Sequence, residues 1–199
     1  MSGNYFTSDD TYYCYPGTCV LKNKFGIQDH EVLVEREGAI TSVKTAIIKA
    51  NPRVGSFDSE YLCAIHRELF CEVYDWAGQF RTVDIAIGIP FCHHEYIQEN
   101  LDRLFMQLHS EGDLRSINDR EELASRLAYY LGELNAIHPF REGNGRTQRI
   151  FIELLARSCG WLLRLSLCER SELSSASEDA IMGDYTSLKK IILRSLTRL

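Results

Sequence analysis

The sequence predicts a mainly α-helical protein with one small β-hairpin, and three observations lead to this prediction. Apolar residues recur at helical spacing over most of the chain. Capping residues, glycines and prolines bound these periodic segments. One stretch, Phe80–Phe91, differs: it is rich in β-branched residues and is interrupted by Gly88 and Pro90, as expected of a hairpin.

The length and composition indicate one globular domain. The chain has 199 residues, of which 45% are hydrophobic and 25% charged, enough to build a buried core. No apolar run approaches the roughly 20 residues that span a bilayer, and the first residues lack the features of a secretory signal. Seven cysteines without a CxxC pair argue against a zinc site or a disulfide framework, so a cytoplasmic location is expected. The net charge of −6 argues against direct nucleic-acid binding.

The first half of the chain is expected to form an arm and two helices before the hairpin. Residues 1–25 indicate an irregular N-terminal arm, because they are rich in Tyr, Gly and Thr. A helix is expected from about Asp29 to Ala50, ended by Asn51-Pro52, because the residue before proline avoids the helical region. The next helix begins at an Asp58 N-cap and is expected to close at Trp76–Gly78.

The second half is expected to be helical throughout. Helices are expected over about His94–His109, Asp119–Ile137, Arg146–Cys159 and Asp184–Arg198. Asp119 and Glu122 form a variant of the capping box, and Gly160 ends the third of these helices.

The segment HPFREGNGRTQR, residues 138–149, concentrates charge on the short turn between two apolar helices. Gly143-Asn144-Gly145 precedes a helix, so backbone N–H groups and the helix dipole can converge on an anion. Arg146 and Arg149 lie three residues apart on one helical face, which suits a polyphosphate. Glu142 beside such a phosphate implies a bridging divalent cation, and Mg²⁺ is the natural one.

His138 completes this set of groups, because histidine is well suited to accept a proton near neutral pH. Phe140 is expected to anchor the turn in the core and to leave His138 exposed at the rim. The combination predicts attack by a hydroxyl on a nucleotide phosphate. Taken one at a time, these residues could equally be a helix end, a turn and two surface ion pairs. Their concentration at one loop-to-helix junction favours the nucleotide interpretation, although no GxxxxGK[ST] motif is present.

The same twelve residues match the HxFx[D/E]GNGRxxR signature of the Fic family, and the chain resembles that family over most of its length. Three flanking stretches resemble it as well: YPGTCVLKNKFGI at 15–27, IHRELFCEVYDWAGQFRTVDI at 65–85 and YYLGELNAIHPF at 129–140. The resemblance implies one Fic domain over residues 1–199, a helical bundle with residues 80–91 as a hairpin flap. It also implies a protein adenylyltransferase, which transfers AMP from ATP to a Tyr, Ser or Thr hydroxyl of a target protein and releases pyrophosphate, with Mg²⁺ or Mn²⁺.

The resemblance implies a role for each matching residue. His138 corresponds to the base that deprotonates the target hydroxyl, and Glu142 to the metal ligand. The family also implies an anion hole formed by Gly143, Asn144 and Gly145. Arg146 and Arg149 correspond to the clamps on the β- and γ-phosphates. Three further residues would lie beside the nucleotide: Asn135, Ile87 and Gly88. The family often has a polar residue at the position of Ile87. An exposed strand edge on the flap could hold a target segment by β-augmentation.

The resemblance also bears on control of activity. The family's brake is a helix with the pattern [S/T]xxxE[G/N], whose glutamate pairs with the second arginine. Ser174–Glu178 comes closest here, but Asp179 follows where Gly or Asn belongs. Glu37-Gly38 and Glu111-Gly112 lack the hydroxyl residue, with Leu33 and Gln107 in its place. The chain therefore resembles the toxin branch, and a separate antitoxin contacting Arg149 is expected, in the bacterial cytoplasm or, for a translocated effector, the host cytosol.

Two alternatives to AMP transfer remain open on the sequence. A related enzyme could move another nucleotide, phosphocholine or phosphate, and a non-catalytic module could bind a nucleotide without reaction. Two other histidine features are not expected to be functional. The adjacent His93 and His94 are poorly spaced for one metal ion, and His66 is expected to be a structural residue of its helix.

Overall fold

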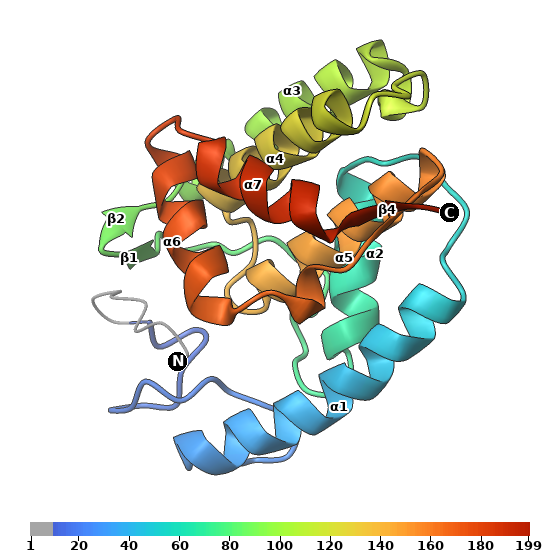
Figure 1. Ribbon diagram of the computed structural model, residues 1–199. Coiled ribbons are helices and arrows are strands. Elements are labelled where there is room, and N and C mark those ends of the chain that lie inside the picture. The colour runs from blue at the N-terminus through green and yellow to red at the C-terminus, as the bar shows by residue number, and fades with distance from the viewer. Residues whose placement is uncertain (1–9) are drawn as a thin grey trace.

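The computed structural model describes residues 10–199 and shows a helical bundle with two small β-sheets (Figure 1). The predicted mainly α fold is confirmed. The first nine residues of the expected N-terminal arm lie outside the described part. The main helices are α1 (His30–Ala50), α2 (Ser59–Phe70), α3 (Ile97–Ser110), α4 (Arg120–Ile137), α5 (Asn144–Ser158), α6 (Arg170–Ile181) and α7 (Thr186–Ser195).

The predicted helix starts are confirmed at three aspartates, because each side chain accepts a hydrogen bond from a backbone N–H of the first turn. Asp29 accepts from Glu31 and Val32, Asp58 from Tyr61 and Asp119 from Glu122. These bonds satisfy N–H groups that have no partner within a helix.

Helix α2 ends at Phe70, earlier than the expected Trp76–Gly78. The N–H groups of Val73 and Tyr74 both bond to the Phe70 carbonyl, which turns the chain out of the helix. The turn lets the rings of Tyr74 and Trp76 stack with their centroids 4.4 Å apart. Aromatic packing therefore replaces the last helical turn that the spacing predicted.

The expected final helix also stops early, since α7 ends at Ser195. Residues Leu196–Arg198 form strand β4, which pairs antiparallel with β3 (Trp161–Leu163) directly after α5. The expectation of one hairpin as the only β structure was therefore incomplete. Leu196 is fully buried in this pairing, which supplies the apolar contact that the helical spacing had suggested.

The predicted hairpin is present but its strands are short. Strand β1 (Ala86–Ile87) pairs with β2 (Ile89–Pro90), and Gly88 turns between them with a φ of +71°. The 3₁₀ turn η1 (His94–Tyr96) then leads into α3. The hairpin projects from one side of the bundle (Figure 1).

Helix α5 forms the centre of the core and packs against α1, α2 and α4. Its Phe151 is fully buried and contacts the rings of Phe57, Tyr61 and Phe105. The surrounding helices thus fix the start of α5, where the charged segment lies. Over residues 10–199, no helix combines the length and the apolar character needed to cross a membrane.

Candidate active site

The turn between α4 and α5 is held in shape by its own residues. Phe140 is fully buried, which confirms its predicted anchoring role. Asn144 accepts a hydrogen bond from the Phe140 N–H at 2.8 Å and donates one to the Phe140 carbonyl at 2.6 Å. The Asn144 side chain is therefore used to close the turn, and what the turn can offer a ligand is its backbone.

Gly143 occupies a position that no other residue fits. Its φ is +79°, and an added Cβ would lie 2.3 Å from the ring of Phe70. Its N–H donates to the Glu142 carboxylate at 2.8 Å. Gly145 is also close to its surroundings, because a Cβ there would lie 3.1 Å from Nη1 of Arg149. The two glycines let the backbone start α5 beneath the arginines.

The structural role predicted for His66 agrees with its contacts. The ring is fully buried in α2, where Nδ1 accepts from the Gly78 N–H at 2.8 Å and Nε2 lies 3.0 Å from the Glu142 carbonyl. It also stacks on Phe140 at 3.9 Å. Burial lowers the pKa of His66 to about 3, so the ring is neutral and holds the turn from below.

Arg146 is held by carboxylates on both sides. Its Nη2 lies 2.6 Å from Oε1 of Glu37 on α1 and 3.4 Å from Oε1 of Glu142, and its guanidinium lies over the ring of Phe70. Glu37 is buried and also accepts a hydrogen bond from the Tyr74 hydroxyl. The sequence did not single out Glu37 as a partner of Arg146.

Arg149 differs from Arg146 in its surroundings. Within residues 10–199, no carboxylate lies within ion-pair distance of its guanidinium. Burial lowers the pKa of Arg149, and the positive charges of Arg146 and Arg170 lower it further. Glu153 offsets this positive charge only in part, because it also pairs with Lys49, so an anion at this position would meet a net positive charge.

A cleft of about 410 Å³ opens beside the two arginines, between α1, α5 and the start of α6. This volume lies in the range typical of small-molecule sites. Its lining includes Lys49 and Arg170 in addition to Arg146 and Arg149, with Glu153 as the acidic member. Because Lys49 already pairs with Glu153, the cleft offers its positive charge mainly through the arginines.

His138 is buried, with 5% of its surface exposed, so the expectation that it stands exposed at the rim was wrong. Phe91, which follows β2, stacks on the imidazole at 3.8 Å and covers it. The residue takes a left-handed conformation, with φ 49° and ψ 63°, at the end of α4. Burial lowers the pKa of His138 to about 3, so the ring is neutral near pH 7.

Glu142 lies between the turn and Arg146, and its side chain is partly buried. Burial raises the pKa of this carboxyl, Arg146 opposes the increase and Glu37 adds to it. The carboxylate therefore lies in surroundings where further positive charge would stabilise it.

The remaining predicted nucleotide contacts lie on α4 and on the hairpin. Asn135, in the last turn of α4, donates to the Ser177 carbonyl at 3.3 Å, and its own carbonyl lies 3.2 Å from Nδ1 of His138. Ile87 and Gly88 form the tip of the hairpin, where the Ile87 side chain is exposed.

Two further arginines have structural roles that the sequence did not reveal. Arg81 is buried, donates to the His138 carbonyl at 2.9 Å and also bonds the Val83 and Cys92 carbonyls, so it ties both ends of the hairpin to α4. Arg141 forms a buried ion pair with Asp10 at 2.7 Å. Neither role has a local sequence signal, because the partners are distant in the chain or are backbone groups.

Within residues 10–199, the three segments that partly match the family's brake do not pair their glutamates with Arg149. Glu37 pairs with Arg146, and Glu111 pairs with Arg126. Glu178 lies on an exposed face of α6. The described part of the chain therefore does not place a carboxylate on the second arginine.

Comparisons with known proteins identify the family of this chain. The Fic/DOC family profile matches residues 56–156. The chain is 37% identical to the probable protein adenylyltransferase Fic of Salmonella typhimurium, over 93% of this chain and 92% of that protein. It is 39% identical to the protein adenylyltransferase VbhT of Bartonella schoenbuchensis, over 93% of this chain but 39% of that longer protein. The predicted enzyme class, a protein adenylyltransferase, is confirmed by these relatives.

Solved structures give the same assignment. The N-terminal Fic domain of a putative cell filamentation protein from Bartonella quintana, with bound ADP, is 30% identical, with a TM-score of 0.88 and coverage of 94% of this chain and 95% of that one. The BepC protein from Bartonella tribocorum, with bound AMPPNP, is 27% identical, with a TM-score of 0.90 and coverage of 95% and 98%. By its sequence match, its relatives and its fold, the chain belongs to the Fic/DOC family.

Proposed function

We propose that the turn between α4 and α5 binds ATP and that this chain transfers AMP to a Tyr, Ser or Thr hydroxyl of a target protein. The observation that carries the proposal is the junction itself. It places the backbone start of α5, the paired arginines and a buried neutral histidine within one twelve-residue segment. The ADP and AMPPNP in the two Bartonella structures support a nucleotide ligand.

In this proposal the β- and γ-phosphates lie against Arg146 and Arg149, over the N–H groups of Asn144 and Gly145. The Gly143 N–H joins them by exchanging the Glu142 carboxylate for a phosphate oxygen. Asn135, Ile87 and Gly88 border the rest of the nucleotide. The helix dipole adds favourable potential for the phosphates. The neutralisation of Arg146 by Glu37 leaves Arg149 as the stronger anchor for the terminal phosphate.

His138 acts as the base. Its Nδ1 faces the Asn135 carbonyl, which fixes the proton on Nδ1 and leaves Nε2 as the proton acceptor. The target hydroxyl oxygen bonds to the α-phosphorus while its proton passes to Nε2. The bond from the α-phosphorus to the bridging oxygen breaks, and pyrophosphate leaves with the electron pair. The phosphate charge nearby favours the protonated ring and offsets its low pKa.

Glu142 would hold a Mg²⁺ or Mn²⁺ ion together with phosphate oxygens. The residues fit this role, since burial and Glu37 both raise the pKa of Glu142 and a cation would relieve the crowded negative charge. When bound, the ion neutralises the phosphates and the departing pyrophosphate.

Labelled nucleotides test the reaction. Purified protein is incubated with a bacterial or host-cell lysate and with ATP that carries the label on either the α- or the γ-phosphate. AMP transfer predicts protein-bound label from the α-position only. Protein-bound label from the γ-position would indicate phosphate transfer. If α-labelled GTP, CTP or UTP labels the target more strongly than α-labelled ATP does, the enzyme transfers another nucleotide. Binding of ATP without any transfer would support the non-catalytic alternative.

We also infer that a small separate protein inhibits this chain by placing a glutamate on Arg149. Arg149 has no carboxylate partner in residues 10–199, and the cleft beside it is open. A bidentate Arg–Glu pair there would occupy the position of the γ-phosphate. This partner and the docking of the target on the hairpin edge are parts of the same proposal.

Expression of the chain alone tests this inference, which predicts an active protein that slows bacterial growth. Glu178→Ala is compared with the exposed control Glu169→Ala. An inert protein that Glu178→Ala alone activates would show that the brake lies within the chain.

A further inference from the structure

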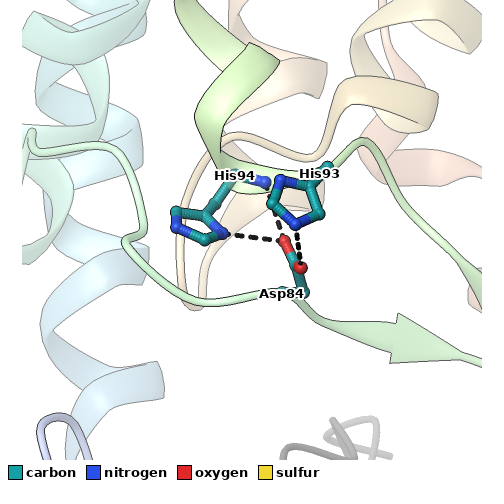
Figure 2. A group of neighbouring side chains, drawn as sticks. All are labelled: Asp84, His93 and His94. Atoms are coloured by element: carbon teal, nitrogen blue, oxygen red, sulfur yellow. Dashed lines mark hydrogen bonds and ion pairs between the residues drawn. The ribbon is translucent and has the colours of Figure 1, made fainter.

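Three side chains at the base of the hairpin converge on one point that the nucleotide site does not use. Asp84 precedes β1, and His93 and His94 follow β2. Oδ2 of Asp84 lies 2.8 Å from Nε2 of His93, and Oδ1 lies 2.9 Å from Nδ1 of His94. Figure 2 shows both imidazoles directed at the same carboxylate.

The spacing of these atoms is close to that of a metal site. The three ligand atoms all lie within 4.8 Å of one another. A zinc-like ion holds N and O ligands at about 2.0–2.2 Å, which places ligand atoms about 3.4 Å apart in a tetrahedron. Around such an ion the two N···O distances would open by about half an ångström, and the widest spacing, up to 4.8 Å, would close by up to about 1.4 Å. The side chains are 30–50% exposed, so small rotations can make this adjustment and water can complete the coordination.

A helix cap explains only part of this arrangement. The backbone N–H of His94 donates to Oδ1 of Asp84 at 2.7 Å, which accounts for an aspartate at this position. A cap does not require either imidazole. The sequence argument against a metal site considered only the adjacent histidines, and it missed Asp84, which the hairpin returns to their side.

The geometry points to a binding site for one divalent transition-metal ion, with Asp84, His93 and His94 as its protein ligands. Two imidazoles and one carboxylate suit Zn²⁺, Ni²⁺ or Co²⁺ better than Mg²⁺. The ligands come from both ends of the hairpin, so the ion would cross-link those ends as a clasp. Phe91 lies between β2 and the two histidines in the sequence, and its ring stacks on His138. The clasp would therefore also hold the Phe91 ring in place over His138. Any effect of the clasp on activity rests on the proposed function, in which the hairpin borders the nucleotide and the target protein.

Titration with Co²⁺, followed by its visible absorption, tests the site without ATP or a target, so failure of AMP transfer does not affect the result. The exposed thiols of Cys19 and Cys71 are alkylated first, because thiolates would compete. One equivalent of Co²⁺ is expected to bind. Asp84→Asn, which can retain the helix cap, and His93→Gln should each weaken binding by on the order of tenfold or more.

His109→Gln is the matched control, because His109 pairs with Asp113 at 2.7 Å but belongs to no group of three metal-ligating side chains within residues 10–199. Its Co²⁺ affinity should equal that of the unsubstituted protein. The site would be overturned if neither Asp84→Asn nor His93→Gln changes the affinity for Co²⁺. It would also be overturned if the unsubstituted protein binds no Co²⁺ up to about 1 mM. If Asp84→Asn fails to fold, the exposed His93→Gln decides the question alone.

Hydrogen exchange of the peptide covering residues 85–91 tests the clasp. Bound Zn²⁺ is expected to slow exchange there at least several-fold, and the His93→Gln protein should show no such change. Stoichiometric binding with unchanged exchange in this peptide would overturn the clasp.

Discussion

The carboxylate of Glu37 on α1 lies 2.6 Å from the guanidinium of Arg146 on α5, so a largely buried ion pair joins two helices at the cleft beside Arg146 and Arg149. Tyr74 donates to the same carboxylate, and Arg146 is held over Phe70. The position of Arg146 is therefore set by the folded protein before any phosphate arrives.

Loss of this pair should destabilise the protein. Glu37→Ala leaves the partly buried Arg146 without its nearest counter-charge, and we expect the free energy of unfolding to fall by about 2 kcal/mol in urea denaturation. Lys44→Ala, which breaks the more exposed Lys44–Glu72 pair of the same helix, should cost less than about 1 kcal/mol. Equal costs for the two substitutions would contradict a structural role for the buried pair.

His138→Ala should separate catalysis from binding. In the proposed mechanism the base acts on the incoming hydroxyl, so transfer of AMP should fall by about 10²–10⁴-fold while the Kd for ATP stays nearly unchanged. His109→Ala, on the surface of α3, is the control and should retain activity. Substantial transfer by the His138→Ala protein would show that another group accepts the proton.

Glu142 should account for the metal requirement. Transfer is expected to need Mg²⁺ or Mn²⁺, and Glu142→Ala should lower activity and abolish the dependence on metal concentration. Activity is measured over a Mg²⁺ titration and after addition of a chelator. Undiminished transfer in excess chelator would exclude the proposed metal role.

Gly143→Ala should damage the turn through sterics. The added methyl would meet the Phe70 ring at 2.3 Å, and the φ of +79° adds backbone strain, so we expect a loss of stability of more than about 2 kcal/mol. Gly160 has nearly the same φ but open space around it, so Gly160→Ala should cost only about 1 kcal/mol. Thermal unfolding of both variants measures the difference, and similar Tm values would contradict this account.

Stability should fall in mild acid because of the buried histidines. The pKa values of His66 and His138 are lowered from 6.5 to about 3, so between these values the unfolded state binds more protons than the folded state. The free energy of unfolding should therefore rise with pH through this window and level off above about 6.5, each histidine contributing at most about 1.4 kcal/mol per pH unit. His66→Gln should reduce the slope of the free energy of unfolding against pH by the contribution of one histidine. An unchanged slope would show that His66 is not the group responsible.

Local features of the fold were predictable from the sequence because they depend on neighbouring residues. The caps at Asp29, Asp58 and Asp119 follow from residue type and position alone, as does the glycine-rich start of α5. The early end of α2 was not predictable, because the stacking of Tyr74 on Trp76 overrides the helical spacing.

The contacts missed in the site are long-range. Nothing near Glu37 in the sequence indicates Arg146, and nothing near His93 indicates Asp84 across the hairpin. The burial of His138 likewise depends on Phe91, from a segment that precedes it by an entire helical hairpin. Such contacts follow from the packing of the helices and from the path of the hairpin, which residue spacing does not determine.

The bonds that close the turn at Phe140, Asn144 and His66 have a thermodynamic consequence for ligand binding. Ordering a flexible loop costs about 1–2 kcal/mol of backbone entropy for each residue. Here folding itself orders the turn, through the bonds of Asn144 and the ring of His66. A nucleotide thus meets a preorganised loop, and the entropy lost on its binding should arise from the nucleotide and nearby side chains.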